Sequence, residues 1–201
     1  LESSSAADIR ATLERLAGTY QEDRLRNDWL LLLGATGDWA NFRAEYAKFR
    51  MRDDRSVSCY ALLSDYAATQ AQVAAQVQGL WLAQRDADDG CASAAEQQLK
   101  AGRMDPEVAW KRARLGMENG RQAIATQAVG LIDPAAVPQV AAIYADPAKF
   151  LDEKRTALRP RTKELVTLAL VRLSAQDPDE AADEAGKLRW LENDERGGLV
   201  E

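Results

Sequence analysis

The stretch VSCYALLSDYAATQAQVAAQVQGLWLAQRDADDGC, from Val57 to Cys91, is the part of the sequence that predicts most about the fold. One face of its second half carries apolar residues at the i, i+4, i+7 and i+8 spacing of a helix, namely Val73, Val77, Leu80 and Trp81. The only two cysteines of the chain, Cys59 and Cys91, bracket this helix. They can form a disulfide if this helix and the one before it make a hairpin, and the bond would then close a loop of about 33 residues. Two free buried thiols are the alternative, because an unpaired cysteine behaves as a small hydrophobic residue.

The composition argues against several classes of function. The chain has 201 residues and a net charge of -6, whereas a nucleic-acid-binding protein is expected to have a basic face. Histidine is absent, which removes Ser-His and Cys-His catalysis, and two cysteines are too few for an ordinary zinc site. No apolar run approaches the roughly 18 residues of a membrane span. We therefore expect no cofactor, no metal site and no membrane-spanning segment. Because the chain begins at Leu1 rather than methionine, we expect a mature or excised piece of a longer protein.

Two helices are predicted shortly before the central stretch. The first is apolar nearly all round, so that we expect burial on both sides, and it should break between Gly34 and Gly37. Its apolar residues are Leu25, Trp29, Leu30, Leu31, Leu32 and Leu33. Asp38 then caps the second helix, whose aromatic residues recur at spacings of three, four and three: Trp39, Phe42, Tyr46 and Phe49.

The second half of the chain repeats one way of starting a helix. An aspartate, which can accept hydrogen bonds from the first turn, stands before a proline suited to the first helical position. The pair occurs at Asp105-Pro106, Asp133-Pro134, Asp146-Pro147 and Asp177-Pro178, and Pro160 is expected to start a further helix. Glycine and proline occupy the junctions, so that no long linker divides the chain.

These patterns predict an all-α protein of about eleven to twelve short helices without strands. Short helices joined by tight turns favour an α-solenoid in which residues 1–201 form one superhelical domain. A compact irregular helix bundle is the structural alternative. We expect six side chains on the apolar stripes to be buried: Trp39, Phe42, Leu80, Trp81, Leu115 and Leu168.

Several short motifs follow one another along the chain in a defined order. In the first half they are Leu25-Arg26-x-x-Trp29-Leu30, Gly37-Asp38-Trp39-x-x-Phe42-x-x-x-Tyr46, Cys59-Tyr60, and Gly79-Leu80-Trp81 followed ten residues later by Cys91. In the second half they are Gly102-Arg103-Met104-Asp105, Trp110-x-x-x-Arg114-Leu115-Gly116-Met117-x-x-Gly120, and Arg172-Leu173-Ser174-Ala175-Gln176-Asp177-Pro178-x-x-Ala181. Together, from about Leu25 to Leu191, they resemble the helical superstructure of soluble lytic murein transglycosylases.

The resemblance implies a fold and a context. In that family, an N-terminal array of helices closes into a superhelical ring, and a lysozyme-like catalytic domain sits on the ring. That domain cleaves peptidoglycan without hydrolysis and leaves a 1,6-anhydro end, with a single glutamate, followed by serine, as acid and base. The family lives in the Gram-negative periplasm, where disulfides persist. Cys59 and Cys91 match a pair that is bridged in the family, so the resemblance implies a disulfide between them.

The catalytic motif of the family does not carry over to this chain. Glu2-Ser3 is the only Glu-Ser dipeptide, and it lies at the N-terminus without the glycine-rich motifs of the catalytic domain. We therefore expect the non-catalytic superhelical domain of a periplasmic lytic murein transglycosylase that acts in cell-wall turnover. Its partners would be peptidoglycan glycan strands and the lysozyme-like catalytic domain of the same chain. The alternative is a free-standing helical-repeat scaffold that binds proteins or peptides.

Few residues are candidates for chemistry in this segment. The carboxylate pairs Asp53/Asp54, Asp88/Asp89 and Glu192/Asp194 lie in polar turns, where capping and hydration explain them better than catalysis, so we assign no catalytic residue. Trp29, Trp39, Trp81 and Trp110 lie on apolar stripes and are expected in the core, whereas Trp190 is a candidate for a sugar contact. One basic cluster is either a solvated face or a contact for peptidoglycan carboxylates or a partner domain: Lys149, Lys154, Arg155, Arg159, Arg161 and Lys163.

Overall fold

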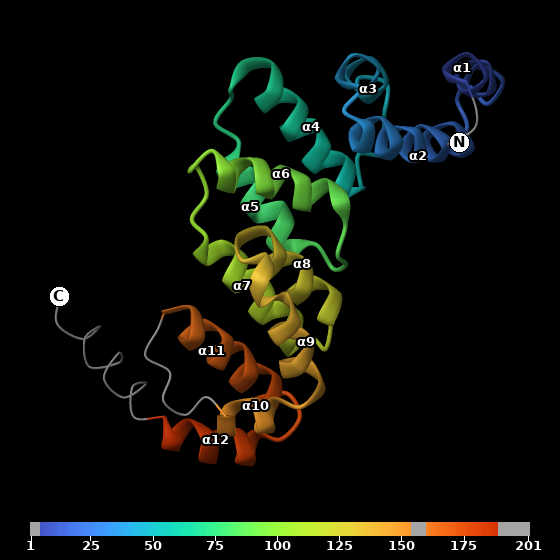
Figure 1. The fold of residues 1–201 in the computed structure, drawn as a ribbon. Coiled ribbons are helices and arrows are strands. Elements are labelled where there is room, and N and C mark those ends of the chain that lie inside the picture. Colours follow the sequence, from blue (N-terminus) through green and yellow to red (C-terminus); the bar gives the residue numbers. More distant parts are fainter. Residues whose placement is uncertain (1–4, 154–159, 189–201) are drawn as a thin grey trace. The chain divides into compact units, whose positions relative to one another are not determined.

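A computed structural model of the chain describes residues 5–153 and 160–188, and every regular element in these two ranges is a helix (Figure 1). The described residues form twelve α-helices and one short 3-10 helix and contain no strand. The all-α fold class and the number of helices expected from the sequence are therefore confirmed.

The chain divides into two compact units, Leu1–Met104 and Asp105–Glu201. The first unit holds six helices: α1 (Ala6–Arg15), α2 (Tyr20–Thr36), α3 (Trp39–Tyr46), α4 (Arg55–Thr69), α5 (Ala74–Ala83) and α6 (Asp89–Lys100). The second holds α7 (Glu107–Glu118), α8 (Gln122–Ile132), the 3-10 helix η1 (Pro134–Ala136), α9 (Val137–Ala145), α10 (Pro147–Glu153), α11 (Pro160–Ser174) and α12 (Pro178–Lys187). The single continuous domain expected from the sequence stays a prediction.

Helix α4 is the centre of the first unit, because it packs against α2, α3, α5 and α6. Cys59 on α4 and Cys91 on α6 form a disulfide, with Cα atoms 4.9 Å apart, which confirms the bond implied by the resemblance. The sequence suggested a hairpin of two helices with Cys91 beyond it, but Cys91 lies inside a third helix. Helix α6 begins at Asp89, before the cysteine, because the Asp88 carboxylate caps it by accepting a hydrogen bond from the backbone N–H of Cys91.

Two glycines allow α4 to approach its neighbours closely. A Cβ atom on Gly34 of α2 would lie 2.4 Å from the ring of Tyr60, and one on Gly90 of α6 would lie 2.3 Å from the Oγ of Ser56. Both distances are far below van der Waals contact, so each position accepts only glycine without a shift of the helices. The break expected between Gly34 and Gly37 therefore lies at the end of that interval, at Gly37, and not at Gly34. Helix α2 continues through the contact and ends at Gly37, whose φ of 71° is left-handed.

The six predicted core side chains divide into two groups. Phe42, Trp81 and Leu168 are fully buried, as expected, whereas Trp39, Leu80 and Leu115 are only half-buried, which corrects the prediction. Trp39 is the first residue of α3 and therefore lies at the end of that helix. Leu80 and Leu115 lie at the edges of the buried faces of α5 and α7, because an apolar stripe on a helix is wider than the strip that its neighbours cover.

Helix α11 has the central place in the second unit, where it packs against α7, α9, α10 and α12. It begins at Pro160, as predicted, and buries one apolar face: Leu165, Val166, Leu168, Ala169 and Leu173. Three of the four aspartates before proline accept a backbone hydrogen bond from the following helix, namely Asp105, Asp146 and Asp177. The fourth, Asp133, pairs with Arg161 instead. None of the helices between residues 5 and 153 or 160 and 188 combines the length and the hydrophobicity needed to span a bilayer.

We predict that replacing both Cys59 and Cys91 by alanine lowers the melting temperature by more than about 10 °C, because the loop closure contributes roughly 3.5–4 kcal/mol. Helical content at low temperature should stay the same, since the helices themselves do not depend on the bond. Circular dichroism during heating measures both quantities. The unchanged protein in a reducing agent is the control and should behave like the double variant. Two reactive thiols in the unfolded, unreduced protein would show that the bond is absent.

We also predict opposite effects for two glycine-to-alanine changes within helices. Gly34→Ala should lower the free energy of unfolding by about 1–3 kcal/mol, because the new methyl group overlaps the Tyr60 ring. Gly79→Ala on α5 is the matched control, since nothing lies within 4 Å of its Cβ position, and it should raise stability by roughly 0.5–1 kcal/mol. Urea denaturation measures both changes, and a stabilising Gly34→Ala would contradict the close helix contact.

Candidate functional site

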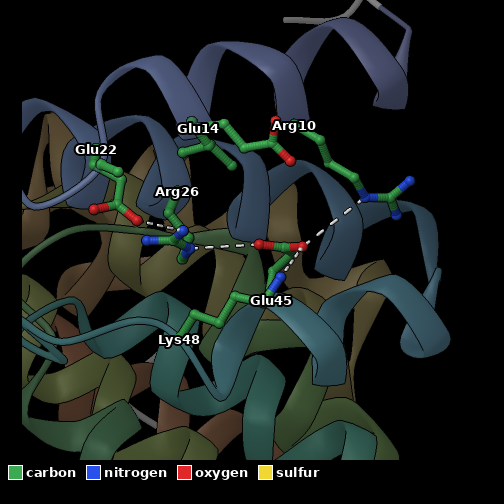
Figure 2. A pocket seen from close by; sticks show the side chains of 8 residues that line it. Arg10, Glu14, Glu22, Arg26, Glu45 and Lys48 are labelled. Atoms are coloured by element: carbon green, nitrogen blue, oxygen red, sulfur yellow. Dashed lines mark hydrogen bonds and ion pairs between the residues drawn. The ribbon is translucent and has the colours of Figure 1, made fainter.

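Charged side chains from three helices line a hollow of about 230 Å³ in the first unit (Figure 2). Its lining residues are Arg10, Leu13 and Glu14 of α1, Ala17 just after it, Glu22 and Arg26 of α2, Glu45 of α3, and Lys48 just beyond α3. Arg26 and Glu45 are almost wholly buried, with relative exposures of 4% and 2%. Burial of opposite charges at this density is costly unless each finds partners, so the contacts of these two residues decide what the hollow can do.

The Arg26 guanidinium is shared among three carboxylates. Its Nη2 lies 2.7 Å from Oε1 of Glu22, its Nη1 lies 3.4 Å from Oδ1 of Asp23, and its Nε lies 3.4 Å from Oε2 of Glu45. All three nitrogen atoms of the guanidinium therefore face a carboxylate oxygen. This arrangement compensates the loss of hydration that burial of the cation imposes.

The Glu45 carboxylate is held by cations on both of its oxygens. Oε2 accepts from Arg26, while Oε1 accepts a hydrogen bond from Lys48 Nζ at 3.1 Å and lies 4.0 Å from Nε of Arg10. Figure 2 shows Arg10, Arg26 and Lys48 reaching the same carboxylate from α1, α2 and the end of α3. Glu45 thus connects three segments of the first unit through charge-assisted contacts.

The same network fixes the segment that follows α3. The Asp23 carboxylate accepts hydrogen bonds from the backbone N–H groups of Arg50 and Met51, the shorter of them 2.7 Å long. The Arg50 guanidinium in turn lies 3.1 Å from Oε2 of Glu22. The buried Asp23 carboxylate therefore binds the backbone of this connection, which explains its presence without any chemistry on a substrate.

The protonation states follow from these contacts. Hydrogen bonds from the Arg26 side chain and from the Gly18 backbone hold the pKa of Glu22 below its ordinary value of 4.5. Burial acts to lower the pKa of Arg26, but the contacts with Glu22 and Glu45 outweigh it and raise that pKa. General acid catalysis of glycosidic cleavage needs a carboxylic acid that can release its proton into a cleft near neutral pH. Glu22 has the opposite shift, and Glu45 has both oxygens engaged by cations.

The second unit contains a half-buried carboxylate with the reverse shift. Burial raises the pKa of Glu164 on α11, Arg114 on α7 opposes the rise, and Glu107 adds to it. Arg114 Nη1 lies 2.8 Å from Oε2 of Glu164, and its Nη2 contacts Glu107. Arg114 therefore ties α7 to α11, which gives the carboxylate a structural role within this unit.

The site residues expected from the sequence fall into three groups. Lys154, Arg155, Arg159 and Trp190 lie outside the described residues, as do Glu192 and Asp194. Arg161 is exposed, but its Nε lies 2.5 Å from Oδ2 of Asp133, and Lys163 is half-buried on α11. The contact of this basic cluster with glycan or with a partner stays a prediction. The carboxylates of Asp54 and Asp88 accept hydrogen bonds from backbone N–H groups in the first turns of α4 and α6. These two residues therefore cap helices, as predicted for carboxylates in polar turns.

The tryptophans differ from one another more than the sequence suggested. Trp29 and Trp81 are buried as expected, whereas Trp39 and Trp110 are half-buried, which corrects their assignment to the core. No group of three or more histidine, cysteine, aspartate or glutamate residues that could hold a metal ion occurs in residues 5–153 and 160–188.

The charged hollow was not predicted from the sequence, although one signal for it was present. Arg26, Leu30 and Leu33 stand at positions i, i+4 and i+7, so that the arginine shares the buried face of α2. That spacing predicts a buried cation, and a buried cation requires acidic partners. It does not reveal Glu45 as the partner, because Glu45 lies 19 positions away on another helix.

Three solved structures are similar to this chain in their fold. The 70-kDa soluble lytic transglycosylase of Escherichia coli matches 92% of this chain with a TM-score of 0.60 and 18% identity. A complex of the 70-kDa soluble lytic transglycosylase with bulgecin A matches 92% with a TM-score of 0.59 and 18% identity. An inactive mutant of the lytic transglycosylase Slt of Pseudomonas aeruginosa matches 91% with a TM-score of 0.55 and 23% identity. This chain shares its all-α fold with soluble lytic transglycosylases.

The match covers nearly all of this chain but only part of each enzyme. The chain spans 30% or 31% of the length of those proteins. The resemblance predicted from the sequence motifs is confirmed at the level of the fold, including its superhelical class. No protein-family model matches the chain, and no curated protein sequence does.

We predict that Arg26→Leu lowers the free energy of unfolding at neutral pH by about 3–5 kcal/mol, because it leaves the buried carboxylates of Asp23 and Glu45 without their shared cation. It should also change the response to acid. Glu22 has a lowered pKa in the folded state, so its contribution to stability is present above pH 4.5 and is lost as pH falls through the folded value. Since Arg26 is the main cause of that shift, this part of the acid response should shrink in the variant.

Urea denaturation at a series of pH values measures both effects. Arg50→Leu is the control, because the Arg50 side chain is 54% exposed and exposed pairs contribute little, at most about 1 kcal/mol. Equal losses in the two variants would contradict the assignment of Arg26 as the centre of the network.

Proposed function

We propose that this chain is the non-catalytic, ring-forming helical domain of a periplasmic lytic murein transglycosylase that acts in peptidoglycan cleavage and cell-wall turnover. The observation that carries the proposal is the match of 91–92% of this chain to 30–31% of three lytic transglycosylase structures. A chain that fits within less than a third of such an enzyme supplies a part of it, and the rest of the protein would supply the chemistry.

The charged hollow supports a structural role for this part. The buried carboxylates of Glu45 in the hollow and of the adjacent Asp23 bind Arg10, Arg26, Lys48 and backbone N–H groups, so they hold α1, α2 and the end of α3 together. We propose that a lysozyme-like domain of the same protein supplies the general acid and base for glycosidic cleavage. The helical domain would shape the access of glycan strands to that domain.

Two further features support the proposed location and partners. A disulfide between Cys59 and Cys91 suits an oxidising compartment such as the periplasm. One of the similar structures is a complex with bulgecin A, and we propose peptidoglycan glycan strands as the ligand of the whole protein. Within this chain, the basic residues of α11 (Arg161 and Lys163) and the preceding Lys154, Arg155 and Arg159 are the proposed contacts for peptidoglycan carboxylates.

A free-standing scaffold that binds proteins or peptides is the second candidate, and an open apolar groove in the first unit favours it. The two functions differ in what the gene encodes after Glu201. Further helices and a lysozyme-like segment with a Glu-Ser motif are expected for the first, and an early stop codon for the second.

We predict that the 201 residues alone do not cleave peptidoglycan, whereas the full-length protein does. The measurement is the release of 1,6-anhydromuropeptides from purified sacculi, resolved by liquid chromatography and mass spectrometry. The control is the full-length protein with the catalytic glutamate of its lysozyme-like domain changed to glutamine, which should release none. Anhydro products from the short chain that disappear on Glu45→Gln would overturn the proposal, because the hollow would then be catalytic.

A further inference from the structure

An open groove of about 470 Å³ lies on the first unit where α2, α4 and α6 pack against one another. It is separate from the charged hollow, and the two share no lining residue. The groove is lined mainly by Asp28, Leu31, Leu32 and Ala35 of α2, Tyr60 of α4 and Asp89 of α6. Its volume is that of an ordinary ligand pocket, within the range of about 300–1,000 Å³.

The surface of the groove is apolar and partly uncovered. Leu31 and Leu32 are half-buried and Ala35 is exposed, although these positions belong to the most apolar helix segment of the first unit. Tyr60 is buried, with a relative exposure of 3%, and its hydroxyl has no hydrogen-bond partner among the described residues. An exposed apolar surface next to a hydroxyl group without a hydrogen-bond partner is typical of an empty ligand-binding groove.

Two exposed carboxylates flank this apolar surface from different helices. Neither Asp28 on α2 nor Asp89 on α6 has a hydrogen bond or an ion pair from its side chain within the part of the chain that the structure describes. The negative charge of α6 reaches the groove: burial raises the pKa of Tyr60 to about 12, and the charges of Asp89 and Asp88 add to the rise. The groove therefore attracts cations and repels phosphates and carboxylates.

The walls of the groove are fixed before any ligand binds. The disulfide between Cys59 and Cys91 joins α4 to α6, and the missing side chain of Gly90 lets the same two helices touch at Ser56. Because Gly34 has no side chain, the Tyr60 ring packs directly against the backbone of α2. A preformed groove loses little conformational entropy on binding, so a small contact area can still give measurable affinity.

We propose that this groove docks a basic amphipathic helical segment of a partner protein, with leucine-like side chains on its floor and lysine or arginine side chains at Asp28 and Asp89. An apolar groove between helices receives the apolar face of a helix, and the two unpaired carboxylates select cations beside that face. The acidic sugars of peptidoglycan, nucleic acids and anionic membranes carry the wrong charge for it. The inference does not depend on the proposed function.

The probe is a synthetic amphipathic helical peptide of leucine and lysine, about 14 residues or roughly four turns long. Its counterpart of leucine and glutamate, with the same length and pattern, tests the charge preference. Titration of the isotope-labelled 201-residue chain, followed by two-dimensional amide NMR, reports both affinity and location. We expect the lysine peptide to shift amide signals of residues 28–35, 56–60 and 89 and the glutamate peptide to shift none of them.

Two variants with matched controls test the groove itself. Asp28→Asn with Asp89→Asn should weaken binding of the lysine peptide about tenfold, whereas Asp65→Asn with Glu118→Gln removes the same charge at exposed positions elsewhere and should leave it unchanged. Ala35→Arg places a large cation in the groove and should abolish binding, whereas Ala67→Arg on the exposed face of α4 should not. All six changed positions, controls included, are exposed, so each variant should keep the parent melting temperature.

Several outcomes would overturn the inference. They are equal binding of the two peptides, signal shifts confined to other surfaces, or no difference between the groove variants and their controls. Concentration-dependent shifts of the same amides without peptide would also overturn it, because a second copy of the chain would then occupy the groove. None of these results bears on whether the chain belongs to a peptidoglycan-cleaving protein, which the sacculus experiment tests separately.

Discussion

Helix α4 lies so close to α2 and α6 that a hydrogen atom is the largest substituent that fits at Gly34 and at Gly90. The Cys59–Cys91 bond fixes one of these two contacts covalently. Interiors of proteins are packed as densely as organic crystals, so helices in such close contact cannot slide past one another without a clash. The close approach of α2 and of α6 to α4 follows from this constraint.

Helix α2 presents different chemistry on its two sides as a result. One side carries Glu22 and Arg26 into the charged hollow, where Glu45 completes the network. The other side carries Asp28, Leu31 and Leu32 into the apolar groove. The hollow has its charges paired internally and acts within the unit, whereas the groove has unpaired charges and an open apolar surface. The hollow therefore serves the stability of the unit, and the groove is the surface proposed to bind a partner.

This division is compatible with the function proposed for the chain. A helical part of a larger enzyme, as proposed, would need rigid helices more than reactive groups, because function is carried by sites rather than by folds. Carboxylates that are bound by arginine, lysine and backbone N–H groups hold helices in place. The same contacts stabilise the charged carboxylate, whereas an acid catalyst must carry a proton that it can release. The fold alone is shared at 18–23% identity, so the chemistry of the neighbours is proposed for the whole protein only.

The sequence by itself determined the helices and most of their starting points. Capping by Asp54, Asp88 and Asp177 and the all-α class follow from signals that act within one or two helical turns, which a sequence displays directly. The disulfide needed the family resemblance, because spacing alone left free thiols open. Only the tertiary structure revealed the continuation of α2 through Gly34, the pairing of Arg26 with Glu45, and the groove over Tyr60. Each of these depends on a partner from another helix, and the packing of helices, unlike their formation, is set by residues far apart in the chain.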